Sequence, residues 1–168
     1  MSNFKKAEKN HNTALKIFDS LQNQKGIDLS YSGLLNTYVS GKNYPKFDSL
    51  YPIAQAVSKT LKSEIYFINL ENKIRKDYYS FDNASMLASS TFGLDTLKNT
   101  NFDSLNYSKN YRIKNLKQNL FQSFQYFNAI AGIKVTNFKD ADYEPLFAIN
   151  EKALEASISK DVRSYRKL

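Results

Sequence analysis

The feature that most constrains the fold is that apolar side chains recur about every 3.6 residues along much of the chain. The cleanest stripe consists of Ile113, Leu116, Leu120, Phe124, Phe127 and Ala131. A shorter stripe consists of Leu34, Leu35, Tyr38 and Val39. Only residues 132–138 resemble a strand, and a lone strand has no partner to pair with, so we expect an extended loop there. The sequence therefore predicts an all-α protein.

Glycines and capping residues mark the ends of the predicted helices. Gly26, Gly41 and Gly132 each follow a periodic segment, where helices commonly end at a glycine with positive φ. Asp28 or Ser30 can cap the second helix. The predicted helices span residues 3–24, about 28–41, 49–90, 113–131 and 142–165, with a loop at 93–108. We therefore expect an irregular helical bundle of five or six helices.

One long central helix over residues 49–90 is the simplest interpretation of the middle of the chain. Its apolar residues first share one face, at Leu50, Ile53, Ala54, Val57, Leu61, Ile65 and Ile68. The stripe then moves to the opposite side, at Phe67, Leu70, Ile74, Tyr78 and Phe81. The two halves would pack against different neighbours. A break at 80–82, where Ser80 and Asp82 are good N-cap residues, is the alternative.

The length of 168 residues and the 42% apolar content suit a single helical domain over residues 1–168. A subdivision into N-terminal helices at 1–60 and a long-helix bundle at 61–168 is the alternative. No stretch approaches the roughly 18 apolar residues of a membrane span, and residues 1–12 are polar and lysine-rich. We expect no membrane span and a soluble protein. The cytoplasm is slightly favoured as its compartment, and a processed secreted or periplasmic domain stays open.

The residue inventory predicts no enzyme, no cofactor and no metal site. Cysteine is absent, which removes disulfides, thiol catalysis and cysteine zinc sites. The single histidine, His11, removes histidine-pair metal sites, and we expect it at the surface or at a helix edge. No carboxylate pair, glycine loop or nucleophile motif suggests a catalytic centre.

One acidic run has the spacing of calcium ligands in an EF-hand loop: Asp140, Asp142, Glu144 and Glu151. The position that needs a glycine with positive φ is occupied by Pro145, whose ring fixes φ near −65°. We therefore interpret the run as the acidic start of a helix and not as a calcium site.

A formal net charge of +8 suggests an anionic partner: nucleic acid, an acidic protein or a membrane surface. Lysine supplies nearly all of this charge, since arginine occurs only at Arg75, Arg112, Arg163 and Arg166. Codon bias alone could produce such lysine usage, and scarce arginine argues against a dedicated phosphate-reading surface. Residues 104–139 mix basic and aromatic side chains, which single-stranded nucleic acid binders also do. Helical spacing favours core aromatics with a solvated basic rim.

The tetrapeptide FDSL occurs three times, at residues 18–21, 47–50 and 102–105. The intervals between the copies are unequal, whereas a solenoid repeats at a fixed period. We interpret the copies as composition bias.

The segment GKNYPKFDSLYPIAQAV, residues 41–57, is the most specific local pattern. It resembles the segment that follows the recognition helix in Cro/repressor-type helix-turn-helix proteins, and the resemblance covers about residues 29–57. It implies that a helix carrying Ser32, Asn36 and Thr37 enters the major groove of DNA, with Lys42 and Lys46 on phosphates.

The residues themselves also allow a second interpretation of this segment. If Ser49 is an N-cap, Pro52 lies in the first turn of a helix and residues 41–48 form a plain loop between two bundle helices. The sequence thus yields two functional hypotheses. The first is a non-enzymatic helical binding or assembly module with a basic surface, whose partner is a protein or another anionic surface and whose oligomeric state is open. The second is a helix-turn-helix DNA-binding protein with a C-terminal helical dimerisation region.

Overall fold

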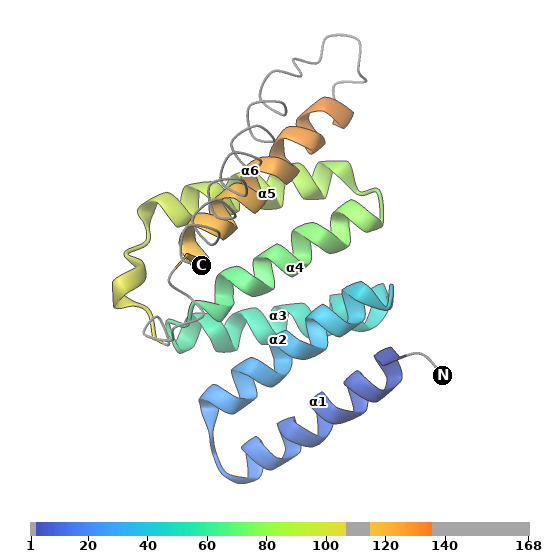
Figure 1. Cartoon of the computed structure of the whole chain (residues 1–168), viewed down its shortest axis with the longest axis vertical. Coiled ribbons are helices and arrows are strands. Elements are labelled where there is room, and N and C mark those ends of the chain that lie inside the picture. The colour runs from blue at the N-terminus through green and yellow to red at the C-terminus, as the bar shows by residue number, and fades with distance from the viewer. Residues whose placement is uncertain (1–2, 107–114, 136–168) are drawn as a thin grey trace, which may run out of the picture.

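The computed structural model describes residues 3–106 and 115–135, and this part of the chain is helical (Figure 1). The helices are α1 (Asn3–Ser20), α2 (Gln24–Ser40), α3 (Tyr44–Thr60), α4 (Ile65–Tyr79), α5 (Asn83–Asn99), the 3-10 helix η1 (Phe102–Ser104) and α6 (Leu116–Val135). The described residues contain no strand beyond an isolated bridge between Ser63 and Asn106. The predicted all-α class is confirmed. Within this part of the chain no helix has both the length and the apolar character needed to cross a membrane.

Four turns between successive helices share one backbone conformation. Each has a non-glycine residue with positive φ, namely Gln22 (51°), Lys42 (55°), Lys62 (49°) and Phe81 (60°). The N–H of the following residue bonds back to the carbonyl five positions earlier, as in Asn23 to Phe18 (2.8 Å) and Asp82 to Asp77 (2.9 Å). This is the Schellman arrangement, which usually employs glycine. The turns follow one another at intervals of 20, 20 and 19 residues.

Polar side chains directly after three of these turns start the next helix. The side-chain oxygen of Asn23 accepts from the N–H of Gly26 (3.0 Å), and that of Asn43 accepts from Lys46 (3.4 Å). Asp82 does the same for Ser85 (3.1 Å). Such caps satisfy N–H groups that have no partner inside the helix. Turn and cap together explain the nearly equal helix lengths.

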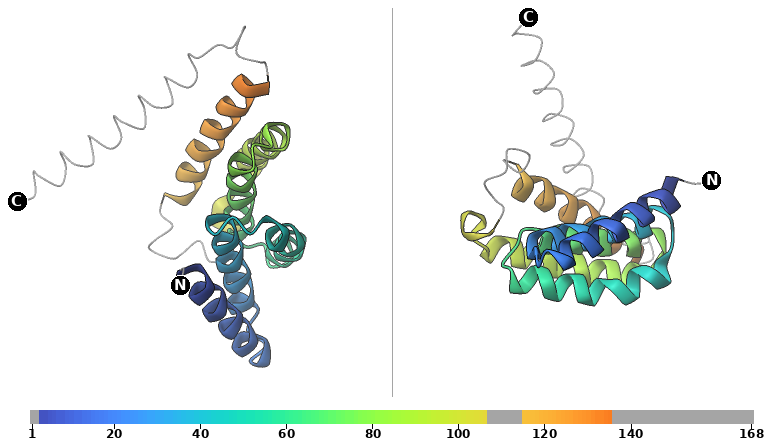
Figure 2. Two further views of the ribbon diagram at one scale, coloured as in Figure 1. Left: turned by 90° about the vertical axis from the view of Figure 1, so that its right-hand side faces the viewer. Right: turned by 90° about the horizontal axis from the view of Figure 1, so that it is seen from below.

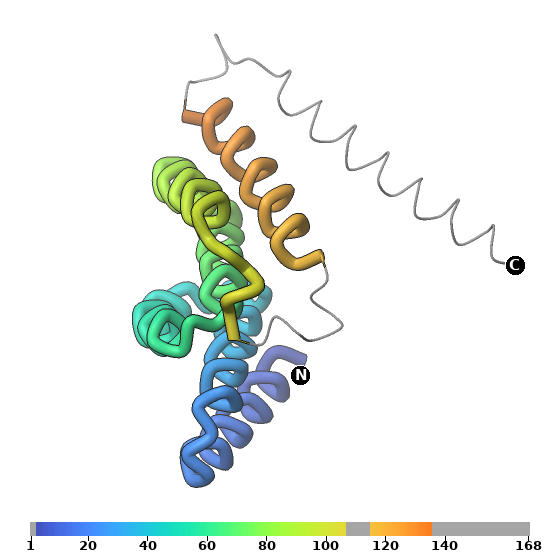
Figure 3. The backbone as a smooth tube through the Cα atoms, turned by 90° about the vertical axis from the view of Figure 1, so that its left-hand side faces the viewer, coloured from blue at the N-terminus to red at the C-terminus, as the bar shows by residue number. Residues whose placement is uncertain are grey.

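Consecutive helices pack side by side. In addition, α2 contacts α4, and α4 contacts α6. Figures 2 and 3 show α2 and α4 in the middle, with α3 on one side and α1 and α6 on the other. This arrangement of hairpins resembles the stacking of α-solenoids. The FDSL copies do not mark a repeat of it, because they lie at the end of α1, inside α3 and across η1. The regular repetition is in the turns instead.

Two apolar clusters hold the stack together. The first joins α2 and α3 through Leu34, Leu35, Tyr38, Val39, Phe47 and Ala54. The second joins α4, α5 and α6 through Phe67, Leu70, Ile74, Met86, Leu97, Leu120, Phe124 and Ala131. The predicted stripe of the second helix is buried, as expected. In the α6 part of the predicted stripe at 113–131, Leu120, Phe124 and Ala131 are buried, whereas Leu116 and Phe127 are partly buried against the same cluster.

The predicted long helix over residues 49–90 is wrong, because the chain turns twice within it. The first turn, at 61–64, has Lys62 in the left-handed region, and the Ser63 hydroxyl accepts from the N–H of Ile65 (3.0 Å). The second lies at Ser80–Asp82, which confirms the alternative break. The apolar stripe changes sides between α3 and α4 because these are two separate helices, each of which directs its own face to the core.

The predicted glycine stops are wrong at two of three positions. Gly26 lies inside α2 and Gly132 inside α6, so residues 132–135 are helical and not extended. Gly41 does end α2, with φ of −86°, and the positive φ falls on the next residue, Lys42. The turns tolerate other residues in the left-handed region, at a cost of about 1 kcal/mol each.

The start of α3 also differs from the prediction. The helix begins at Tyr44, capped by Asn43, and continues through Pro52, so residues 44–48 are helical and Ser49 is not an N-cap. Pro52 is exposed, where water can satisfy the carbonyl group that the missing N–H leaves without a partner. The predicted loop at 93–108 is wrong as far as residue 99, where α5 ends. The predicted helix at 142–165, the acidic run at 140–151 and Ile113 lie outside the described residues.

Candidate binding groove

A groove of about 440 Å³ opens between the end of α3, the α3–α4 turn, the start of α4, and α5 with η1. Its lining consists of Ser58, Lys59, Lys62, Ser63, Tyr66, Phe67, Phe92, Thr96, Thr100, Ser104 and Leu105. These residues are spread over almost fifty positions of sequence, so only the packing of the hairpins brings them together.

The segment after η1 closes one side of the groove. The N–H of Asn106 donates to the carbonyl of Lys62 (2.9 Å), and its side-chain amide donates to the carbonyl of Leu61 (2.5 Å). The Phe102 ring packs against that of Phe67, with centroids 5.1 Å apart. The wall formed by η1 and Leu105 is thereby fixed to the α3–α4 turn.

Aromatic rings form much of the inner surface. Phe67 is buried in the core cluster, and Tyr66 meets it edge to face with centroids 5.3 Å apart. Phe92 of α5 is 52% exposed although it lines the groove. A large apolar side chain that remains half in water is a common mark of a binding surface.

Most hydroxyl groups of the lining already donate to protein acceptors. Thr96, Thr100 and Ser104 donate to the backbone carbonyls of Phe92, Thr96 and Asn101, each at 2.7 Å. The donors left over are the phenol of Tyr66 and the ammonium groups of Lys59 and Lys62, which form no ion pair or hydrogen bond within the described part of the chain. None of the described residues that line the groove carries a carboxylate. Its free polar groups therefore favour an acceptor or an anion.

A buried polar cluster lies behind the groove at Ser58. The Ser58 hydroxyl donates to Asp28 Oδ1 (2.5 Å) and accepts from the Asn69 amide (3.1 Å). Asp28 and Glu64 are fully buried, and within the described structure Asp28 Oδ2 and both Glu64 carboxylate oxygens accept no hydrogen bond.

The pKa values of both acids are raised. Burial raises the pKa of Asp28, and hydrogen bonds from Ser58 and Ser63 oppose this rise only in part. Burial also raises the pKa of Glu64, opposed by its own backbone and by the charge of Lys25. The described residues contain no group of three or more side chains of the types that hold metals. The cluster therefore supports the fold beneath the groove and supplies no ligand set.

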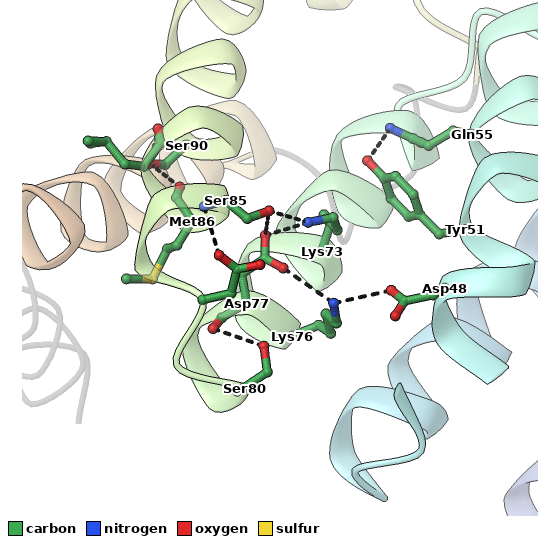
Figure 4. Close-up of polar contacts among 12 residues, drawn as sticks. Asp48, Tyr51, Gln55, Lys73, Lys76, Asp77, Ser80, Ser85, Met86 and Ser90 are labelled. Atoms are coloured by element: carbon green, nitrogen blue, oxygen red, sulfur yellow. Dashed lines mark hydrogen bonds and ion pairs between the residues drawn. The ribbon is translucent and has the colours of Figure 1, made fainter. Parts of the chain in front are cut away.

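A second polar cluster surrounds Asp77 at the α4–α5 turn (Figure 4). Lys73 Nζ lies 2.5 Å from Asp77 Oδ2 and 2.7 Å from Ser85 Oγ, and the Ser85 hydroxyl donates to Asp77 Oδ2 (2.9 Å). Lys76 bridges Asp77 (3.7 Å) and Asp48 (3.2 Å). A serine beside a lysine can act as a nucleophile when the lysine accepts its proton. Here the lysine is the donor and the serine proton points to Asp77, so the geometry fastens α4 to α5.

The residues implied by the helix-turn-helix resemblance lie away from the groove. Ser32 and Thr37 of α2 are buried (8% exposed each), and the Thr37 hydroxyl donates to the carbonyl of Gly33 (2.8 Å). Asn36 is exposed and accepts from Arg75 of α4 (3.0 Å). The other two, Lys42 and Lys46, follow on the turn and on α3.

The exposed lysines of this set differ in their surroundings. Lys46 forms an ion pair with Glu8 of α1 (2.5 Å), which lowers the pKa of Glu8. Lys42 is exposed in the turn. His11, predicted at the surface or at a helix edge, is half-buried on α1, where its ring covers Gly33. The structure thus places Ser32 and Thr37 in helix packing and leaves the side chains of Asn36, Lys42 and Lys46 accessible.

The groove was not predicted from the sequence, because no local pattern of residues indicates it. Lys59 and Lys62 look like ordinary surface lysines, and Phe92 is one aromatic residue among many. The one usable signal is the phase of α5, in which Phe92 lies off the face that carries Met86 and Leu97 to the core. Comparisons with protein-family models, with curated proteins and with solved structures found no match to this chain.

Proposed function

We propose that this protein is a non-enzymatic helical binding module that holds a segment of a partner protein in the groove between the α3–α4 turn and α5. The observation that carries the proposal is the combination of a half-exposed Phe92 with two lysines that have no partner among the described residues, in one cavity of about 440 Å³. That volume lies within the roughly 300–1,000 Å³ of ordinary ligand sites.

The architecture supports this function. Stacked helical hairpins present an extended surface whose binding residues come from several hairpins, and such stacks commonly bind other proteins. The floor of the groove is fixed by buried Phe67, and its outer wall is tied down through Asn106. A site held in this way loses little conformational entropy when a partner binds.

Selection from a random peptide library displayed on phage tests the proposal. Peptides should be enriched on the full-length protein and lost on a Phe92→Glu variant. Phe81→Glu is the matched control, because Phe81 is 78% exposed and lies at the α4–α5 turn, outside the groove. Failure to enrich any peptide, or equal enrichment on Phe92→Glu, would contradict the proposed function.

Duplex DNA is the second candidate partner. It is favoured by the net charge of +8 and by the exposed side chains of Asn36, Lys42 and Lys46. The burial of Ser32 and Thr37 does not support it, because a recognition helix presents such residues to the bases.

A further inference from the structure

We infer that the segment held in the groove is acidic and carries one large apolar side chain. This inference rests on the proposed function and specifies the chemistry of its partner. The apolar side chain would pack against Phe92 and Phe67, and carboxylates on either side of it would face Lys59 and Lys62.

The charge of the groove is the first argument. Lys59 on the last turn of α3 and Lys62 in the α3–α4 turn both line the cavity, and neither is paired within the described residues. Lys46 and Lys76, which lie near other hairpin turns, are paired with Glu8 and Asp48, whereas Lys42 in the α2–α3 turn, like Lys62, has no side-chain partner among the described residues. Behind the groove, the carboxyl groups of Asp28 and Glu64 are buried, and burial raises the pKa of both. An anionic segment is therefore complementary to the groove, and a cationic one is not.

The unused hydrogen-bonding groups are the second argument. The hydroxyl protons of Thr96, Thr100 and Ser104 are directed to backbone carbonyls, so the free groups are the Tyr66 phenol and the two ammonium groups. Burial raises the pKa of Tyr66, which keeps its phenol protonated as a donor. The occupant must supply acceptors, and carboxylates are the strongest acceptors that a peptide offers.

The exposure of Phe92 decides between a peptide and a small molecule. A small ligand is held when most of its surface, roughly 70–90%, is enclosed by its site. Half of Phe92 remains in water in a groove that is open to solvent. An extended segment that continues past the groove at both ends can cover this ring and still place side chains inside.

Fluorescence anisotropy with defined peptides tests the inference on the full chain. The probe is a fluorescein-labelled decapeptide with one phenylalanine between glutamates. Two further probes replace the glutamates by glutamines or the phenylalanine by serine. We expect the first probe to bind and each of the others to bind at least about fivefold more weakly, since exposed charge pairs and half-buried rings each contribute about 1 kcal/mol.

Charge reversal provides the matched control. The Lys59→Glu/Lys62→Glu variant should weaken binding of the acidic probe at least about tenfold, because attraction is replaced by repulsion. The Lys5→Glu/Lys6→Glu variant on α1 changes the net charge by the same amount on exposed residues and should have less than about a twofold effect. Circular dichroism checks that both variants are folded.

Three results would overturn the inference. In the first, the control variant weakens binding as much as the groove variant. In the second, 3-phenylpropionate displaces the probe with the affinity of the whole peptide, so that the groove is a small-molecule site. In the third, library selection yields Phe92-dependent peptides that are neutral or basic. That last result would leave the proposed function standing, whereas the absence of any selected peptide would remove both.

Discussion

Phe124 of α6 lies directly over Gly93 of α5. A Cβ atom built on Gly93 would be 2.7 Å from Phe124 Cδ2, closer than real side chains approach, and 3.3 Å from Leu70 Cδ2. Phe124 is fully buried in the cluster of α4, α5 and α6. The absence of a side chain at residue 93 is therefore what allows α5 and α6 to pack closely.

Gly93→Ala should lower the free energy of unfolding by about 1–3 kcal/mol, because the ring has no room to move. Gly132→Ala in α6 is the control: among the described residues, no heavy atom beyond its chain neighbours and its own helix backbone lies within 4 Å of the added Cβ, and alanine should stabilise the helix by roughly 0.5–1 kcal/mol. Phe124→Ala should cost about 3–5 kcal/mol. Urea unfolding followed by circular dichroism measures all three. A neutral Gly93→Ala variant would show that the α5–α6 contact is looser than described.

The buried acids predict a fall in stability with rising pH. Burial raises the pKa of Asp28 and Glu64 in the folded protein, so above about pH 4 to 5 the folded state binds more protons at these two groups than the unfolded chain does. The free energy of unfolding is then highest at acidic pH and decreases as the pH rises toward the folded-state values. Each unit of pKa elevation removes about 1.4 kcal/mol.

Urea unfolding at several values between about pH 4 and pH 8 measures this slope. Asp28→Asn and Glu64→Gln should each flatten it. The control is Glu8→Gln, because the hydrogen bond from Lys46 lowers the pKa of Glu8 and its contribution is lost only as the pH falls below the usual glutamate range. If stability rises with pH in the unmodified protein, or both variants keep its slope, the pKa values of the two carboxyl groups are not raised by burial.

The left-handed residues of the turns predict a stabilising substitution. Lys42→Gly should raise the free energy of unfolding by about 0.5–1 kcal/mol, since glycine adopts φ of 55° without the clash that a Cβ brings. Ala56→Gly at an exposed position of α3 should have the opposite effect, a loss of about 1 kcal/mol. The same urea experiment compares them. A destabilising Lys42→Gly would mean that this side chain contributes contacts beyond the turn.

Binding to duplex DNA separates the two candidate functions. A helix-turn-helix protein should retain sequence-selective binding at physiological salt. Replacing Lys42 or Lys46 by alanine should then each lower the slope of log affinity against log salt by about 0.9, and changing Asn36 should alter the preferred sequence. A binding module with diffuse charge should attach weakly to any polyanion, and this attachment should disappear by about 0.2 M salt.

We expect the second result, because Lys46 is paired with Glu8 and Asn36 with Arg75. Anisotropy of a labelled duplex across a salt series measures the slope, and footprinting measures selectivity. A footprint abolished by substitution of Asn36 would support the DNA-binding alternative instead.

The sequence by itself determined the helical class and much of the core. Leu34, Leu35 and Val39 repeat at helical spacing, and all three are buried. A helix with this spacing carries its apolar side chains on one face, and that face leaves water when it packs against the core. The N-cap at Asp82 was also predictable from the sequence, because its carboxylate accepts a hydrogen bond from the N–H of Ser85, a contact between residues close in sequence.

Only the tertiary structure decided where the chain turns and what the turns bring together. The reversals at Gln22, Lys42, Lys62 and Phe81 place ordinary residues in the left-handed region, at a cost that packing of the hairpins outweighs, so glycine positions were a poor guide. The glycines serve instead as contact points, as Gly26 does beneath Phe18. The groove depends on the same packing: Lys59, Phe92 and Leu105 are far apart in sequence and meet because α3, α4 and α5 fold back on one another. Which side chains of a helix are buried follows from the periodicity of that segment alone. Which helix face packs against which other face depends on the side chains of both helices, and these come from different segments of the chain.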